Sequence, residues 1–135
     1  MMTDPTLVSV FHQWHCDHFG HVNTRHYAAM FDDAICAFWS GFGVALSGIV
    51  PVTAQMVTRF QSEAQAGAAI RVHAQLLRIG GKSVTLELTM TDPSGRRLAT
   101  CEVVEVFFDT TTRKSTLMPD HIRQALQRSA GPGLS

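Results

Sequence analysis

One long apolar helix followed by a run of strand-like segments is the feature that most constrains the fold of this chain. Between residues 24 and 42, apolar side chains recur at three- and four-residue intervals, which is the spacing of one broad helix face. These side chains are Tyr27, Met30, Phe31, Ala34, Ile35, Phe38 and Phe42. Asn23 and Thr24 are both suitable N-cap residues, and Gly41 and Gly43 suit the helix end. A helix this apolar needs cover on most of its sides.

The remaining segments predict an antiparallel sheet of five strands. Residues Leu7–Trp14 alternate in polarity before the helix, as a half-buried strand does. Three further segments alternate after the helix, at 52–60, 70–76 and 84–90, and a fourth strand-like segment follows at 98–109. The last of these is apolar on both faces, which favours a central position in the sheet.

Turn and helix signals join and close these segments. Gly80-Gly81 and the run Asp92 to Gly95 predict tight turns between neighbouring strands. Pro119 with Asp120 predicts a short C-terminal helix that continues to about Arg128. Residues 129–135 are expected to form a loose tail.

The composition favours a single soluble domain in the cytoplasm. The 135 residues, of which 45% are hydrophobic, suit one domain spanning residues 1–135. The formal net charge is zero, so the basic excess of a nucleic-acid-binding protein is missing. Three widely spaced cysteines favour a reducing compartment over a disulfide framework. Neither a signal peptide nor an apolar run of about 18–20 residues is present, so no membrane association is expected.

The side chains best suited to chemistry gather between the first strand and the long helix. Five of the seven histidines lie in this stretch, namely His12, His15, His18, His21 and His26. Asp17 stands among them. A carboxylate in this position can lie against the exposed N–H groups of a helix start, which favour negative charge. We therefore expect any catalytic site here.

The same stretch also contains the ligand types that zinc prefers. Its histidine spacing from His12 to His21 matches no recognised structural zinc pattern, and the run straddles a strand end and a loop. A metal site is therefore the less favoured interpretation, and we expect no metal or other cofactor.

One extended motif resembles a known family. The pattern Trp14-x-x-Asp17-x-x-Gly20-His21-Val22-Asn23-x-x-x-Tyr27, followed by Asp33-Ala34, is similar to that of the hotdog-fold acyl-CoA thioesterases of the 4-hydroxybenzoyl-CoA thioesterase type. Weaker matches follow in the expected order, at Glu63-Ala64, Gly81-Lys82-Ser83-Val84 and Val106-Phe107-Phe108-Asp109. The resemblance spans residues 7–128. This chain departs from the family at Thr24, where a second Asn is common, and in its extra histidines.

The resemblance implies a fold and an assembly. The fold is α+β, a hotdog in which a five-stranded antiparallel sheet wraps one long helix, with a short C-terminal helix added. The family forms homodimers, often paired into homotetramers, with active sites at the dimer interface. The sequence pattern agrees, because a sheet with a single helix buries one face and leaves its edges in need of a partner.

The resemblance also implies hydrolysis of an acyl-CoA thioester to a free acid and coenzyme A. Asp17 would act as nucleophile or as general base, and the sequence leaves both open. A backbone N–H at the helix start, at Thr24 or a neighbour, would stabilise the oxyanion. His21 and Asn23 would either orient the loop or contact the thioester.

Four further residues are expected to bind or surround the substrate. Gly20 would permit a turn with positive φ or a close approach to the acyl group. Tyr27 would form part of the pocket wall. By resemblance, Lys82 and Ser83 would lie near the pantetheine and nucleotide of coenzyme A.

Two other functions suit the same fold. The protein could bind acyl-CoA without turning it over, as a sensor. Histidine and aspartate together could also support hydration or dehydration of an acyl thioester, although the relatives that do so carry a different local motif.

Overall fold

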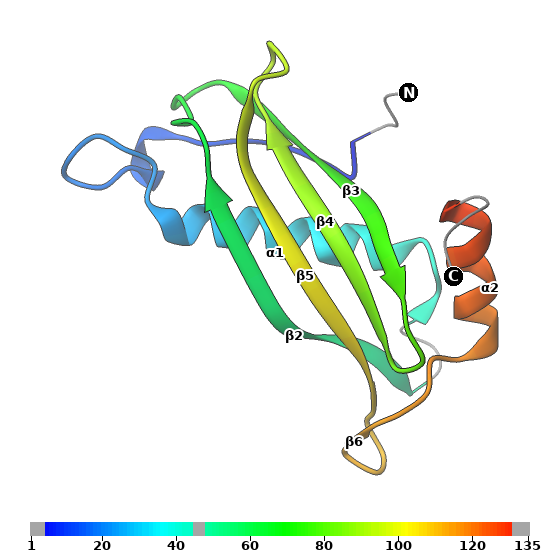
Figure 1. The fold of residues 1–135 in the computed structure, drawn as a ribbon. Coiled ribbons are helices and arrows are strands. Elements are labelled where there is room, and N and C mark those ends of the chain that lie inside the picture. The colour runs from blue at the N-terminus through cyan, green and yellow to red at the C-terminus, as the bar shows by residue number, and fades with distance from the viewer. Residues whose placement is uncertain (1–4, 45–47, 131–135) are drawn as a thin grey trace. The chain divides into compact units, whose positions relative to one another are not determined.

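The computed structural model describes residues 5–44 and 48–130 of an α+β chain (Figure 1). Its elements, in chain order, are β1 (Leu7–Val10), a 3₁₀ turn (Gln13–His15), α1 (Thr24–Ser40), β2 (Ile49–Phe60), β3 (Ala69–Ile79), β4 (Ser83–Thr91), β5 (Arg97–Asp109), β6 (Lys114–Ser115) and α2 (Asp120–Ala130). The strands form one sheet in the order β1-β3-β4-β5-β2, and the short β6 pairs with β5. No helix in the described ranges is long and apolar enough to cross a membrane.

The burial of each strand follows its place in the sheet. Strand β4 alternates strictly between buried and half-buried residues, as a strand with one face on the core should. Strand β5 lies between β4 and β2, and four of its consecutive residues, 98–101, are buried. Strand β2 is an edge strand and is mostly exposed. The central position predicted for residues 98–109 is therefore confirmed.

The first strand is shorter than its sequence pattern predicts. Strand β1 ends at Val10, and residues 13–15 form a 3₁₀ turn in place of the predicted continuation to Trp14. Within this turn the His12 N–H donates to Nδ1 of His15 at 2.7 Å. The partner strand β3 begins at Ala69, opposite Val10, so the regular pairing of β1 ends there.

The C-terminal part is predicted correctly except at its edges. Helix α2 starts at Asp120 as expected and ends at Ala130, so residues 129 and 130 are helical and their assignment to a loose tail is wrong. Residues 131–135 of that tail lie outside the described ranges. Strand β6 was not predicted, since two polar residues carry no periodicity. It follows a turn in which Arg113 adopts a φ of 62°.

The chain contains two compact units. Unit 1 comprises the described parts of Met1–Phe38, Val57–Ala74 and Leu88–Cys101. Its core includes the fully buried Phe11 and Phe31. Tyr27 of α1 contacts the rings of Phe11 and Phe60 at centroid distances of 5.2 and 5.1 Å. The start of the long helix is thereby fixed against the end of β2.

Unit 2 comprises the described parts of Trp39–Met56, Gln75–Glu87 and Glu102–Ser135. Its core holds a carboxyl group, that of Glu105, which is 1% exposed. The Trp39 indole Nε1–H donates to Oε1 of Glu105 at 3.0 Å, whereas Oε2 has no hydrogen-bond partner in the described chain. The Trp39 ring also meets the Phe107 ring edge-on. Trp39 therefore supplies both packing and the hydrogen bond that this carboxyl receives.

Replacing Trp39 by phenylalanine is expected to lower the free energy of unfolding by about 2–4 kcal/mol, since the Glu105 carboxyl loses its buried donor. Adding Glu105→Leu to Trp39→Phe should recover part of this loss, because two apolar partners leave no polar atom unsatisfied. Denaturant titration of the wild type, of each single variant and of the double variant measures both effects. A double variant whose loss equals the sum of the single losses would contradict this account.

Candidate active site

Residues 16–22 form a closed loop immediately before α1. Cys16 and Val22 pair in an antiparallel bridge, and the Asp17 N–H donates to the His21 carbonyl at 2.8 Å. Gly20 has a φ of 83°, in the region that glycine adopts most easily. A Cβ on Gly20 would meet nothing within 4 Å, so the turn, and not crowding, explains the glycine. The expected positive-φ turn is confirmed.

The Asp17 carboxylate is turned into this loop. Its Oδ1 accepts hydrogen bonds from the N–H groups of Phe19 at 2.9 Å and His21 at 3.3 Å. Its Oδ2 accepts none from any described residue. The expected contact with N–H groups of the helix start is not observed, since both donors belong to the loop. Asp17 therefore closes the loop with one oxygen and leaves the other available.

The helix start is capped by Asn23. Its Oδ1 accepts from the Arg25 N–H at 3.1 Å, and its carbonyl accepts from the His26 N–H at 3.0 Å. Asn23 itself donates to the His15 carbonyl at 2.9 Å. These hydrogen bonds connect Asn23 to both the loop and the helix start, and its contact with a thioester stays a prediction. The N–H of Thr24, the first residue of α1, finds no acceptor within the described ranges.

A pocket of about 370 Å³ opens at this helix start. It is lined by His21, Val22, Thr24, Tyr27, Phe60, Gln61, Ser62 and Glu63. The structure thus brings together three of the predicted site residues, His21, Thr24 and Tyr27. Asp17 is not among the lining residues, although its main chain is hydrogen-bonded to His21. The volume lies within the range typical of small-molecule sites.

Tyr27 forms a wall of this pocket, as expected. The residue is 4% exposed, and its hydroxyl oxygen accepts from the Ala64 N–H at 3.2 Å. Burial raises the pKa of the Tyr27 phenol, and the charges of Glu63 and Cys16 add to the rise, while the Ala64 hydrogen bond opposes it. The phenol is therefore neutral at physiological pH, and its oxygen holds the Ala64 N–H by a hydrogen bond.

Glu63 lies in the pocket but was not predicted as a site residue. Its Oε1 lies 3.5 Å from Nε2 of His21, and both side chains are more than half exposed. The sequence offered only the weak similarity of Glu63-Ala64 to the family pattern. No local motif marks a glutamate that follows an edge strand.

The remaining histidines pack against neighbouring rings. His12 stacks on Trp14 at a centroid distance of 4.0 Å, and His15 meets His26 edge-on at 4.6 Å. Desolvation lowers the pKa of His26, and His15 and Arg25 lower it further. Within the described ranges, no three His, Cys, Asp or Glu side chains are placed to hold a metal ion.

Lys82 and Ser83 lie in unit 2, at the turn between β3 and β4. The Lys82 carbonyl accepts from the Phe107 N–H at 2.9 Å, and the Ser83 carbonyl accepts from the Gly80 N–H at 2.8 Å. The Lys82 residue is exposed and Ser83 is half-buried. Their role in binding coenzyme A stays a prediction.

Comparison with known proteins identifies the family. Residues 10–126 match the model of the thioesterase-like superfamily, whereas no curated protein matches the sequence. A hypothetical protein from Staphylococcus aureus, solved in complex with CoA, superposes with a TM-score of 0.85 at 22% identity, covering 100% of this chain and 90% of that one. The probable thioesterase YbaW from Escherichia coli superposes with a TM-score of 0.78 at 21% identity, covering 93% and 98%.

A third solved structure, a 1,4-dihydroxy-2-naphthoyl-CoA thioesterase from Synechocystis, superposes with a TM-score of 0.76 at 14% identity, covering 89% of this chain and 93% of that one. Identities this low show a common fold, and the antiparallel sheet with two helices is consistent with a hotdog. The family model covers most of the sequence, so the family does not depend on these structures. The chain belongs to the thioesterase-like superfamily.

Proposed function

We propose that this protein hydrolyses acyl-CoA thioesters to a free acid and coenzyme A. One observation carries the proposal most directly. The pocket of a thioesterase-like fold opens at the start of its long helix, where the Thr24 N–H lacks an acceptor in the described chain. The CoA present in the Staphylococcus aureus neighbour supports this ligand class.

The Thr24 N–H is the proposed donor of the oxyanion hole. It is the first N–H of α1, so the positive end of the helix dipole adds to its effect. Attack on a thioester carbonyl places negative charge on the carbonyl oxygen. A fixed donor that points at this oxygen stabilises the transition state without reorganisation.

Asp17 is the proposed nucleophile or general base. Two N–H groups hold its Oδ1, which fixes the carboxylate and leaves Oδ2 for chemistry. As nucleophile, Oδ2 would attack the acyl carbon and expel the CoA thiolate, leaving a mixed anhydride for water to hydrolyse. As general base, it would take a proton from the attacking water.

The roles of Gly20, Lys82 and Ser83 and the oligomeric state are part of the same proposal. Gly20 lets the loop turn so that Asp17 and His21 are held together, and Lys82 with Ser83 would bind the coenzyme A moiety. The motif favours an enzyme of the 4-hydroxybenzoyl-CoA thioesterase type that forms a homodimer or homotetramer, and the cysteine pattern favours the cytoplasm. The exposed edge strand β2 suits such an assembly.

Release of free thiol from acetyl-, hexanoyl-, palmitoyl- and benzoyl-CoA tests the proposal. Hydrolysis of at least one of them is the expected result, and the preferred acyl group then indicates which acyl size the pocket accepts. Tight binding of these compounds without thiol release would indicate a sensor instead. Hydration of an enoyl-CoA without thiol release would indicate a hydratase.

A further inference from the structure

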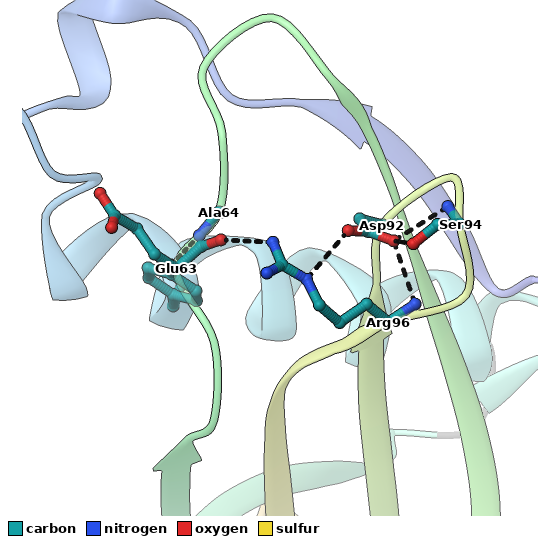
Figure 2. Close-up of polar contacts among 6 residues, drawn as sticks. Glu63, Ala64, Asp92, Ser94 and Arg96 are labelled. Carbon is teal, nitrogen blue, oxygen red and sulfur yellow. Dashed lines mark hydrogen bonds and ion pairs between the residues drawn. The ribbon is translucent and has the colours of Figure 1, made fainter.

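The peptide group between Glu63 and Ala64 is held on both sides (Figure 2). Its N–H donates to the Tyr27 hydroxyl at 3.2 Å, and its carbonyl accepts from Nη2 of Arg96 at 3.1 Å. Tyr27 belongs to α1, and Arg96 lies in the turn before β5. Two segments far away in the sequence therefore fix one peptide in the pocket wall.

Arg96 is itself anchored within its turn. Its Nε donates to Oδ2 of Asp92 at 3.2 Å, and its N–H donates to Oδ1 of Asp92 at 3.0 Å. The Ser94 hydroxyl also donates to Oδ1 of Asp92, at 2.6 Å. This Ser94 bond is the largest cause that lowers the pKa of Asp92, with the bonds from Arg96 adding to it. The turn thus presents a fixed guanidinium to the Glu63 carbonyl.

The guanidinium holds the main chain of Glu63 and leaves its carboxylate free. Figure 2 shows the Glu63 side chain extending away from Arg96. Its Oε1 lies 3.5 Å from Nε2 of His21, and both residues line the pocket with Thr24. An Nε2–H that faces the carboxylate leaves Nδ1 of His21 as the proton acceptor of the ring.

We propose that Glu63 is a positioning residue of the active site, which holds His21 as the group that moves protons in the pocket. Tyr27 and Arg96 set the position of Glu63 through its peptide group. The inference rests on the proposed thioester hydrolysis and assigns separate tasks within it. Asp17 makes the nucleophilic attack, and His21 activates the water molecule that then hydrolyses the anhydride.

Asp17 Oδ2 bonds to the acyl carbon as the C–S bond breaks, which releases the CoA thiolate. Nδ1 of His21 then takes a proton from water as its oxygen attacks the acyl carbon of the anhydride. The anhydride C–O bond breaks to give the free acid and the Asp17 carboxylate. The imidazolium returns its proton to the CoA thiolate. A carboxylate that faces Nε2 stabilises this imidazolium, as in other carboxylate–histidine pairs.

Glu63→Gln is expected to lower kcat and KM together by about 10- to 100-fold while kcat/KM stays within about threefold, because attack on bound substrate is intact and the water step that follows is not. The fastest-hydrolysed acyl-CoA of the panel serves as probe. Rapid mixing should reveal a burst of one thiol per site followed by slow turnover, since the anhydride accumulates. A purely structural effect would lower the burst and the steady rate together. Glu63→Asp should recover part of kcat.

Arg96→Met should show the same burst. The double variant of Arg96→Met with Glu63→Gln should be no slower than Glu63→Gln alone, because Arg96 acts through Glu63. Arg71→Met and Glu102→Gln are matched controls, since both side chains lie on exposed strand positions. They should keep the wild-type kcat. Circular dichroism and denaturation midpoints of every variant establish that the fold is retained.

The outcomes separate this inference from the proposed function. Wild-type hydrolysis with a burst in Glu63→Gln supports both. If the wild type hydrolyses acyl-CoA and Glu63→Gln has an unchanged kcat, or a lowered kcat without a burst, the role of Glu63 is overturned. The proposed hydrolysis is then unaffected. Absence of hydrolysis by the wild-type protein overturns both.

Discussion

Replacement of Asp17 by asparagine is expected to lower kcat by about 100- to 10,000-fold, since either proposed role needs the carboxylate. The substitution is close to isosteric. Asparagine keeps the Oδ1 that accepts from the N–H groups of Phe19 and His21, so the loop stays closed. It removes the negative charge and replaces the free Oδ2 with an amide nitrogen that cannot attack the thioester or accept a proton.

Steady-state thiol release and a denaturation curve for the same preparation separate chemistry from folding. Asp17→Ala is a poorer test, because it also removes the acceptor that closes the loop. Asp32→Asn, at an exposed position of α1, is the matched control and should keep the wild-type rate. Undiminished turnover in a folded Asp17→Asn protein would exclude both roles of Asp17.

The fold could be predicted largely because its signals are local. The apolar periodicity of residues 24–40 and the strand patterns of the four later segments each depend on neighbours in sequence, and the structure confirms a helix and strands at these places. The helix start was predicted for the same reason, because Asn23 caps its own helix. The error at the first strand lies where Nδ1 of His15 accepts from the His12 N–H. The pattern of polar and apolar residues gives no sign of such a hydrogen bond.

The site was predictable only in part, because half of it is assembled across long sequence separations. His21 and Thr24 follow Asp17 in one short motif. The Glu63–Ala64 peptide, however, is held by partners 33 and 37 residues away, at Arg96 and Tyr27. No spacing in the sequence marks that contact. The motif also identified Asp17 without revealing that one of its oxygens closes the loop.

Replacement of Thr24 by proline is expected to lower kcat by about 100- to 1,000-fold, the usual effect of losing one oxyanion donor. Proline removes the backbone N–H itself, which no ordinary side-chain substitution can do. The site tolerates it for two reasons. Thr24 is the first residue of α1, a position that proline favours, and its N–H donates to no described acceptor, so no structural hydrogen bond is lost. An N-cap residue such as Asn23 has the extended backbone that a following proline requires.

Thr24→Ala supplies the matched control, because it removes the hydroxyl and keeps the N–H, and it should retain a kcat close to that of the wild type. KM should change little in either variant, since the donor acts mainly on charge that develops in the transition state. Helix content by circular dichroism verifies that α1 is intact. A folded Thr24→Pro protein with the wild-type kcat would show that the oxyanion is stabilised elsewhere. A loss in Thr24→Ala equal to that in Thr24→Pro would assign the effect to the side chain and would contradict a main-chain oxyanion hole.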